Sequence, residues 1–346
     1  MRLYEYVIRR LILMLFVLAG VSIITFYLSR GFPQAIAPWT PYITPKMTAQ
    51  QIERIIRDHG FDQPLYVQYF YWLRDILRGD WGYTGFWANG LPAYDVFASR
   101  FPYTVELAVL AVLFTLALGL PLGIISAVRN NRMPDHLSRL VALVGISTPV
   151  YWFGFLLQLA FFYYFYSLGL PYLPHRGALS EGLEGAVPRI TGMPILDGLL
   201  AGNLAYAWDA FLHALLPSFT LSFISLGYLT RLVRASMLEV LRQDYIVLAR
   251  SKGLRERIVI YRHALRNALI PALTVAGLLF AGLLGGAVIT EYIFEWPGVG
   301  WSSLLAVLQG DSNFIMLYTL VFAVIVVTAN LIVDVLYALV DPRIKY

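Results

Sequence analysis

An amide and a carboxylate lie four residues apart near the C-terminal end of this sequence. Asn330 and Asp334 would share one face of a helix, because residues four apart are neighbours on a helical surface. A carboxylate inside a membrane helix normally faces the protein interior or a water-filled pathway. The pair is therefore a candidate part of a translocation path. The alternative is a structural hydrogen bond to a neighbouring helix.

Two glutamates, Glu291 and Glu295, have the same spacing and would share a face if the preceding helix continues past them. Paired carboxylates are the catalytic groups of glycoside hydrolysis. No other residue pattern in the sequence builds an enclosed active site around them. We therefore do not expect this pair to be catalytic.

Other arrangements that carry chemistry are absent from the sequence. The five histidines never occur at metal-ligand spacing, and the chain has no cysteine. There is no glycine-rich phosphate-binding loop and no Ser/His/Asp arrangement. The sequence therefore predicts neither an enzyme nor a metal or cofactor site.

The segment 244–254, DYIVLARSKGL, has the pattern of a short basic helix between two long apolar runs. Apolar and charged residues alternate around it at helical spacing, which predicts a helix, a short helix, a break at Gly253 and a further helix. The small Ala249 and the missing side chain of Gly253 would permit close approach to another protein. Arg250 and Lys252 would add polar contacts at the rim. Such a helix could transmit force from a soluble partner; the alternative is a basic loop that only sets membrane topology.

The elements that must position these residues are membrane helices. Of the 346 residues, 59% are hydrophobic and 14% are charged, whereas a soluble domain carries about 25% charge. Six apolar runs each approach or exceed the roughly 18–20 residues that a helix needs to cross a bilayer, where the backbone must be helical. They are residues 11–28, 107–128, 140–168, 210–230, 268–290 and 314–333. The predicted fold class is an all-α integral membrane protein with six transmembrane helices.

Six spans place both termini on one side of the membrane, and the distribution of Lys and Arg indicates which side. The densest basic segment, 231–266, lies on the side of the termini, so the positive-inside rule places both termini in the cytoplasm. The net charge of +5 arises largely from such membrane-flanking loops, and we expect no nucleic-acid partner. Arg9 and Arg10 precede the first run without a cleavage site after it, so we expect this run to be retained as a span.

The extracytoplasmic segment between the first two spans is long enough to fold. Thr48 and Gln51 form a capping-box pattern, and Pro64 opens a second run with helical spacing. The aromatic residues here would pack on one another or at the membrane interface; the alternative is a surface that receives a solute-delivering partner. The predicted domains are an N-terminal end with span 1 (1–29), a helical extracytoplasmic insert (30–102) and a five-span core (103–346). The core spans are expected at 103–128, 140–168, 209–232, 268–291 and 314–340, with a cytoplasmic loop at 233–270.

The stretch DYIVLARSKGLRERIVIYRHALRNALIP, at 244–271, is similar to the cytoplasmic EAA loop of permease subunits from ABC importers of the dipeptide/oligopeptide class. Three further stretches also resemble that family: GFDQPLYVQYFYWLRDILRGDWGYT, ITEYIFEWPGVG and NLIVDVLYALVDPRIKY. The resemblance covers essentially the whole chain. It departs after the first span, where residues 31–34 are GFPQ, so no substrate contact of the outer region is transferred.

The resemblance implies the type I permease architecture of ABC importers. Two different permeases would form the channel, each would dock its EAA loop into an ATPase subunit, and an extracytoplasmic solute-binding protein would deliver the solute. By this resemblance the ATPase-coupling residues are Asp244, Tyr245, Leu248, Ala249, Arg250, Lys252 and Gly253. The candidates for an outer gate or for docking the binding protein are Trp81, Glu295, Trp296, Pro297 and Gly298.

The predicted function is ATP-driven import of short peptides, or of similar small solutes such as oligosaccharides, by alternating access in the cell membrane. ATP hydrolysis is expected on the partner subunits. The alternative is an autonomous secondary transporter or channel, which would favour coupling charges near the midplane and internal repeats. No convincing repeat is present in the sequence.

Overall fold

The computed structural model describes residues 3–31, 37, 39–43, 46–284 and 288–340. Within these residues the regular structure is helical, apart from one isolated bridge between Tyr83 and Pro92. The chain forms two compact units, one of residues 1–104 and 297–346 and the other of residues 105–296. The predicted all-α class is confirmed.

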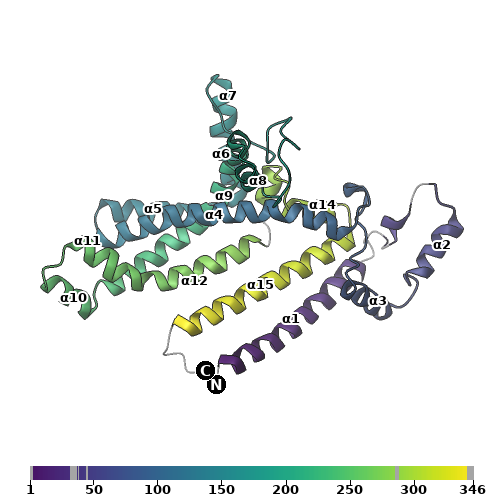
Figure 1. The fold of residues 1–346 in the computed structure, drawn as a ribbon, viewed down its shortest axis with the longest axis horizontal. Coiled ribbons are helices and arrows are strands. Elements are labelled where there is room, and N and C mark those ends of the chain that lie inside the picture. Colours follow the sequence, from purple (N-terminus) through teal and green to yellow (C-terminus); the bar gives the residue numbers. More distant parts are fainter. Residues whose placement is uncertain (1–2, 32–36, 38, 44–45, 285–287, 341–346) are drawn as a thin grey trace. The chain divides into compact units, whose positions relative to one another are not determined.

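The first unit is built on two apolar helices, α1 and α15, which lie side by side (Figure 1). Its helices are α1 (Leu3–Gly31), η1 (Thr40–Tyr42), α2 (Ala49–Asp58), α3 (Leu65–Leu77), η2 (Phe86–Ala88), the first part of α4 (Ala93–Val128), α14 (Val299–Leu308) and α15 (Ser312–Val340). Apolar side chains of α1 remain exposed, such as Leu15 at 68% and Phe16 at 71%. A row of such side chains on one helix belongs against lipid or another protein.

The helices α2 and α3 form where the sequence predicts them. The capping box of α2 is present, because Gln51 N donates to Thr48 Oγ1 at 3.4 Å and Thr48 N donates to Gln51 Oε1 at 2.8 Å. The helix α3 packs on α1 through Tyr69 and Trp72, whose rings contact Phe26. The rings of Tyr69 and Trp72 also contact each other, so aromatic residues of the insert pack on one another as predicted.

The second unit surrounds α9. In the most apolar part of this helix, 67% of the residues are buried. Its helices are the rest of α4, α5 (Met133–Ser147), α6 (Val150–Gln158), the π-helix η3 (Leu159–Tyr164), α7 (Phe165–Ser167), α8 (Pro194–Leu200), α9 (Leu204–Val240), α10 (Asp244–Ser251), α11 (Glu256–Ile258), the π-helix η4 (Val259–Ala264), α12 (Leu265–Leu284) and α13 (Val288–Ile293). Gly119 and Gly123 let α4 approach α9: a Cβ on Gly123 would lie 2.7 Å from the Cβ of Val233. These small residues bring the two helices into direct contact.

Four described helices are long and apolar enough to cross a membrane, namely α1, α4, α9 and α15. The segment predicted as a span at 140–168 is not one continuous helix, because α5 and the helical stretch that begins with α6 meet at an angle of 106°. The break falls at Thr148, whose ψ of 125° is extended, since a proline disfavours helical geometry in the residue before it and Pro149 follows. Counting this bent pair as one span gives five. The predicted span 268–291 includes residues 285–287, which lie outside the described residues.

Two further boundaries differ from the prediction. The helix α9 extends beyond the expected 209–232 at both ends, and Asn203 caps its start by accepting from Tyr206 N at 3.1 Å. The helix α14 lies between the last two predicted spans, where no helix is predicted from the sequence. Gly298 is its N-cap residue.

Candidate functional site

The short helix α10 joins α9 to α12 and is anchored by one apolar face (Figure 1). Ile246 is fully buried and Ala249 is 7% exposed, and both pack in a cluster with Met237, Val259 and Ala264. The small side chain of Ala249 therefore permits close packing within this chain. This differs from the expected approach of Ala249 to another protein, because periodicity indicates that a face is apolar without indicating what covers it.

Three other apolar or aromatic side chains of α10 are exposed. Tyr245, Val247 and Leu248 are 41%, 53% and 56% exposed. Asp244 in the first turn and Lys252 at the C-terminal end are also exposed, each at the helix end where its charge is favourable. Exposed apolar side chains with a charged rim have the composition of a protein-binding surface.

Gly253 ends α10 as the sequence predicts. Its φ is +74°, a conformation that glycine adopts without steric cost, and its N–H donates to Arg250 O at 2.9 Å. A Cβ at this position would meet no atom within 4 Å. Within this chain the glycine is thus required by the turn, and the space beside it is open to a partner.

The turn after α10 is closed by an ion pair. Arg250 Nη2 donates to Glu256 Oε1 at 2.7 Å, and Arg250 Nε donates to Glu256 Oε2 at 3.2 Å. The hydrogen bonds from Arg250 lower the pKa of the Glu256 carboxyl, and the same bonds raise the pKa of Arg250. Arg250 is therefore engaged inside the chain as well as exposed at the rim. On the other side, Asn267 Nδ2 donates to Tyr245 Oη at 2.8 Å and ties α10 to α12.

A hollow of about 540 Å³ lies next to α10. It is lined by Tyr245, Arg262, His263, Arg266 and Asn267. Its cationic lining favours acidic groups on whatever binds there.

Sequence reasoning missed a buried ion pair between the start of α5 and α9. Asp135 accepts from Arg234 Nε at 2.8 Å and from Arg234 Nη2 at 3.0 Å. Asp135 also accepts from Ser126 Oγ and from Asn131 N, and its side chain is fully buried. A lone acid in a basic turn was the only sequence signal. The pair locks the α4–α5 turn onto α9.

The outer candidates occupy different environments. The side chain of Trp296 is fully buried, and its backbone N–H donates to Glu291 O at 2.8 Å. Glu295 is exposed with φ of +47°, because α13 ends at Ile293. Glu291 and Glu295 therefore do not share a helical face.

The remaining outer candidates belong to the first unit. Trp81 is half-buried against a cluster that contains Phe97 and Phe314. Pro297 and Gly298 directly precede α14. A gating or docking role for Trp81, Glu295, Trp296, Pro297 and Gly298 remains a prediction.

The polar pair near the C-terminal end lies in α15. Asn330 is exposed on that helix. The backbone of Asp334 belongs to α15, and its side chain lies outside those that the structure describes. A role of the pair in a translocation path remains a prediction.

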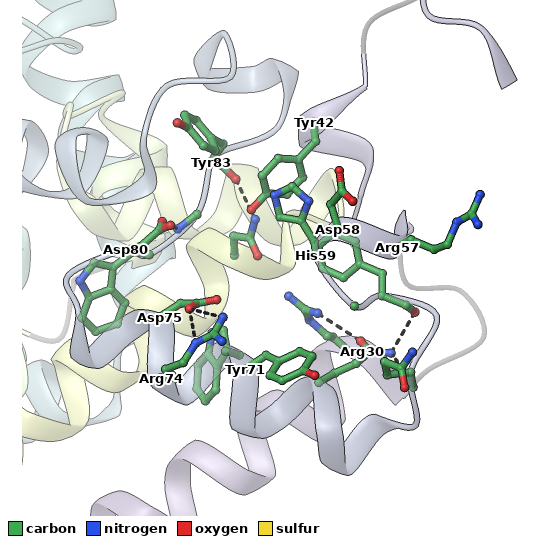
Figure 2. Close-up of a pocket in the computed structure, with 18 residues that line it drawn as sticks. Arg30, Tyr42, Arg57, Asp58, His59, Tyr71, Arg74, Asp75, Asp80 and Tyr83 are labelled. Carbon is green, nitrogen blue, oxygen red and sulfur yellow. Dashed lines mark hydrogen bonds and ion pairs between the residues drawn. The ribbon is translucent and has the colours of Figure 1, made fainter. Parts of the chain in front are cut away.

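Figure 2 shows a cavity in the insert that no sequence pattern predicts. It measures about 670 Å³ and lies between the end of α1, the segments around α2 and α3, and Asn313 of α15. Its lining is polar and aromatic, with three arginines among the lining residues. The residues that form it come from several segments of the chain.

Two family profiles cover nearly all of the chain. The family described as "Binding-protein-dependent transport system inner membrane component" matches residues 119–346, and the corresponding N-terminal family matches residues 3–108. The chain therefore belongs to the family of inner membrane components of binding-protein-dependent transport systems. It is a permease subunit of an ABC importer.

Curated relatives match over almost their whole length. The probable D,D-dipeptide transport system permease protein DdpB of Escherichia coli (strain K12) is 40% identical over 95% of this chain and 94% of that protein. The dipeptide transport system permease protein DppB of Alkalihalophilus pseudofirmus is 37% identical over 99% of each chain. The oligopeptide transport system permease protein AppB of Bacillus subtilis (strain 168) is 34% identical over 99% of each chain.

Proposed function

We propose that this permease imports short peptides and forms its channel together with a second, different permease. The observation that carries the substrate class is the full-length match to three relatives that are named for dipeptide or oligopeptide transport. In this proposal the chain crosses the membrane six times and has both termini in the cytoplasm. An extracytoplasmic binding protein delivers the peptide, and two ATPase subunits supply the energy.

Within this proposal, α10 is the element that couples the permease to an ATPase subunit. Its buried face holds it to α9 and α12, and its exposed face presents Val247 and Leu248. A ligand or partner shifts a conformational equilibrium only through contacts that differ between the two states. A helix fixed to two long helices on one side and free on the other can make such contacts. The basic hollow beside it would receive acidic groups of the ATPase.

The test replaces Leu248, which is 56% exposed, with aspartate. Leu248→Asp should reduce co-purification of the ATPase subunits by at least about ten-fold, because it places a charge in an apolar contact. Peptide uptake into cells should fall in parallel. Met133→Asp is the control, because Met133 is 70% exposed at the start of α5, away from α10 in the sequence. Wild-type uptake by the Leu248 variant would contradict the coupling role.

The peptide substrate is tested by competition. Cells that carry the complete importer as their sole peptide uptake system should accumulate a radiolabelled dipeptide, and an excess of unlabelled dipeptide should suppress this uptake. An equal excess of a disaccharide should leave it unchanged. Cells that accumulate a radiolabelled disaccharide but no dipeptide would replace the peptide assignment with an oligosaccharide.

A further inference from the structure

The cavity in the insert has the size and walls of a small-molecule site. Its volume of about 670 Å³ lies within the roughly 300–1,000 Å³ of typical ligand pockets. Six aromatic side chains line it: Tyr42, Phe61, Tyr71, Trp72, Trp81 and Tyr83. Charged side chains complete the lining, among them Arg30, Asp58 and Asp80, so the wall offers both aromatic and ionic contacts.

Arg30, at the end of α1, brings a positive charge into this cavity (Figure 2). Its Nη1 donates to Gln68 Oε1 at 3.3 Å, whereas its Nε is buried and has no hydrogen-bond partner. Its guanidinium carbon lies 5.1 Å from the ring centre of Phe26 and 5.2 Å from that of Phe61. A buried donor without an acceptor is costly, so this group has unused capacity for an anionic ligand.

The other two arginines of the cavity are already paired. Arg74 lies 2.9 Å from Asp75, and Arg57 lies 3.7 Å from Glu53. No acidic side chain in the described part of the chain forms an ion pair with Arg30. Of the three arginines, Arg30 is therefore the one whose positive charge a bound ligand would balance.

A negative group faces the cavity from another side. Figure 2 shows Asp80 across the cavity from Arg30. One oxygen of Asp80 accepts from Gly82 N at 2.9 Å, which fixes the carboxylate without neutralising it. Burial, followed by the negative charge of Asp80, raises the pKa of Tyr42 to about 12, so its hydroxyl remains a hydrogen-bond donor at neutral pH. A ligand with opposite charges at its two ends fits this arrangement.

We propose that this cavity binds a short peptide, with the free C-terminal carboxylate against Arg30 and the ammonium group toward Asp80. The aromatic walls would contact the peptide's side chains. The inference rests on peptide transport as the proposed function, and it adds a solute site on the permease itself. Bidentate pairing of a guanidinium with a carboxylate supplies both affinity and orientation.

The first test changes the ligand and leaves the protein unchanged. Full-length wild-type chain in phosphatidylcholine nanodiscs is titrated calorimetrically with L-alanyl-L-phenylalanine and with the C-terminal amide of the same dipeptide. The free acid should bind at least about ten-fold more tightly, since a hydrogen-bonded charge pair is lost with the amide. Equal affinities, or no binding of the free acid, would overturn the proposal.

Variants then assign the effect to Arg30. Arg30→Gln should abolish the preference for the free acid, and Arg30→Lys should retain part of it. Arg57→Gln is the matched control, because it removes an arginine of the same cavity whose side chain is 66% exposed. Thermal unfolding of each variant checks its fold, and the ligand comparison above decides the question if Arg30→Gln does not fold. A folded Arg30→Gln variant that keeps the preference counts against the site.

Two further arms separate the possible explanations. Nanodiscs that also contain phosphatidylglycerol should leave dipeptide affinity unchanged; a ten-fold loss would assign Arg30 to a lipid phosphate and overturn the proposal. Peptide uptake by the complete importer is measured independently. Uptake without binding in this cavity would overturn this inference and leave the proposed function standing. Binding without uptake would support the site and overturn the proposed function.

Discussion

Asp135 and Arg234 carry opposite charges that are taken out of water together. The Asp135 side chain is fully buried, and that of Arg234 is 21% exposed. Such a pair contributes little relative to a well-packed apolar pair, but removal of one partner leaves a buried charge without compensation. A substitution that removes one partner should therefore lower the free energy of unfolding by more than the pair as a whole contributes to it.

Asp135→Asn should lower the free energy of unfolding by about 3 kcal/mol, measured as a lower thermal unfolding temperature in mild detergent. Arg139→Gln is the control. Arg139 lies 4.0 Å from Asp135 with a side chain that is 51% exposed, so its loss should cost less than about 1 kcal/mol. Equal effects of the two substitutions would argue against a buried, tightly bonded pair.

The stability contributed by the ion pair of Arg250 and Glu256 should depend on pH and should be lost in acid. The pKa of Glu256 is lowered in the folded chain from its ordinary value of 4.5. Its contribution to stability is therefore complete above pH 4.5 and is lost as the pH falls through the lower, folded-state pKa. Because both side chains are about half exposed, the contribution is below about 1 kcal/mol.

Glu256→Gln should therefore unfold at a slightly lower temperature than wild type at pH 7. The difference should be the same at pH 6 and should close below pH 4.5, as the wild-type carboxyl becomes protonated. Glu53→Gln, at a more exposed pair with Arg57, gives the background for an ordinary surface ion pair. A difference that grows on acidification would contradict the expected sign.

Pairs of helices are held at distances that particular small residues permit. The helix α4 lies against α9 at Gly123, where a Cβ would fall 2.7 Å from the Cβ of Val233 and 2.9 Å from Thr230 O. Real Cβ contacts of this length require the helices to move apart. Only glycine at this position therefore allows α4 to lie so close to α9.

Gly123→Ala should destabilise the fold by about 1–3 kcal/mol through overpacking, measured by thermal unfolding in detergent. Gly20→Ala in α1 makes the same chemical change where no atom lies within 4 Å. The control should be neutral or stabilising by up to about 1 kcal/mol, because alanine favours helix more than glycine does. A Gly123 variant as stable as the control would contradict the close packing.

The membrane topology of the chain can be determined with single cysteines, because its sequence contains none. In the proposed six-span arrangement, Asp62 lies outside the cell and Lys252 lies in the cytoplasm. A membrane-impermeant maleimide should therefore label Asp62→Cys in intact cells and should label Lys252→Cys only after permeabilisation. Both positions are exposed in this chain, and the labelling is done on cells without the ATPase subunits, so protection cannot arise from burial. Labelling of Lys252→Cys in intact cells would reverse the topology.

Much of the local architecture could be predicted from the sequence. Apolar runs indicated the long helices α1, α4, α9 and α15, since only a helix satisfies its own backbone over such a length. The capping residues of α2 and the break at Gly253 after α10 were equally local, because caps and turns depend on a few consecutive side chains.

Tertiary structure alone decided which of these side chains face inward and which meet one another. Ala249 faces inward, although it was expected to approach another protein, and Trp296 is buried, although it was a candidate for an outer gate or a docking surface. Arg234 pairs with Asp135, which lies 99 residues away along the chain. Arg30 lines a cavity whose wall includes Asn313. The physical reason is that burial and ion pairing depend on groups brought together from distant segments. Helical periodicity, capping and the length of an apolar run depend only on residues that are neighbours in the sequence.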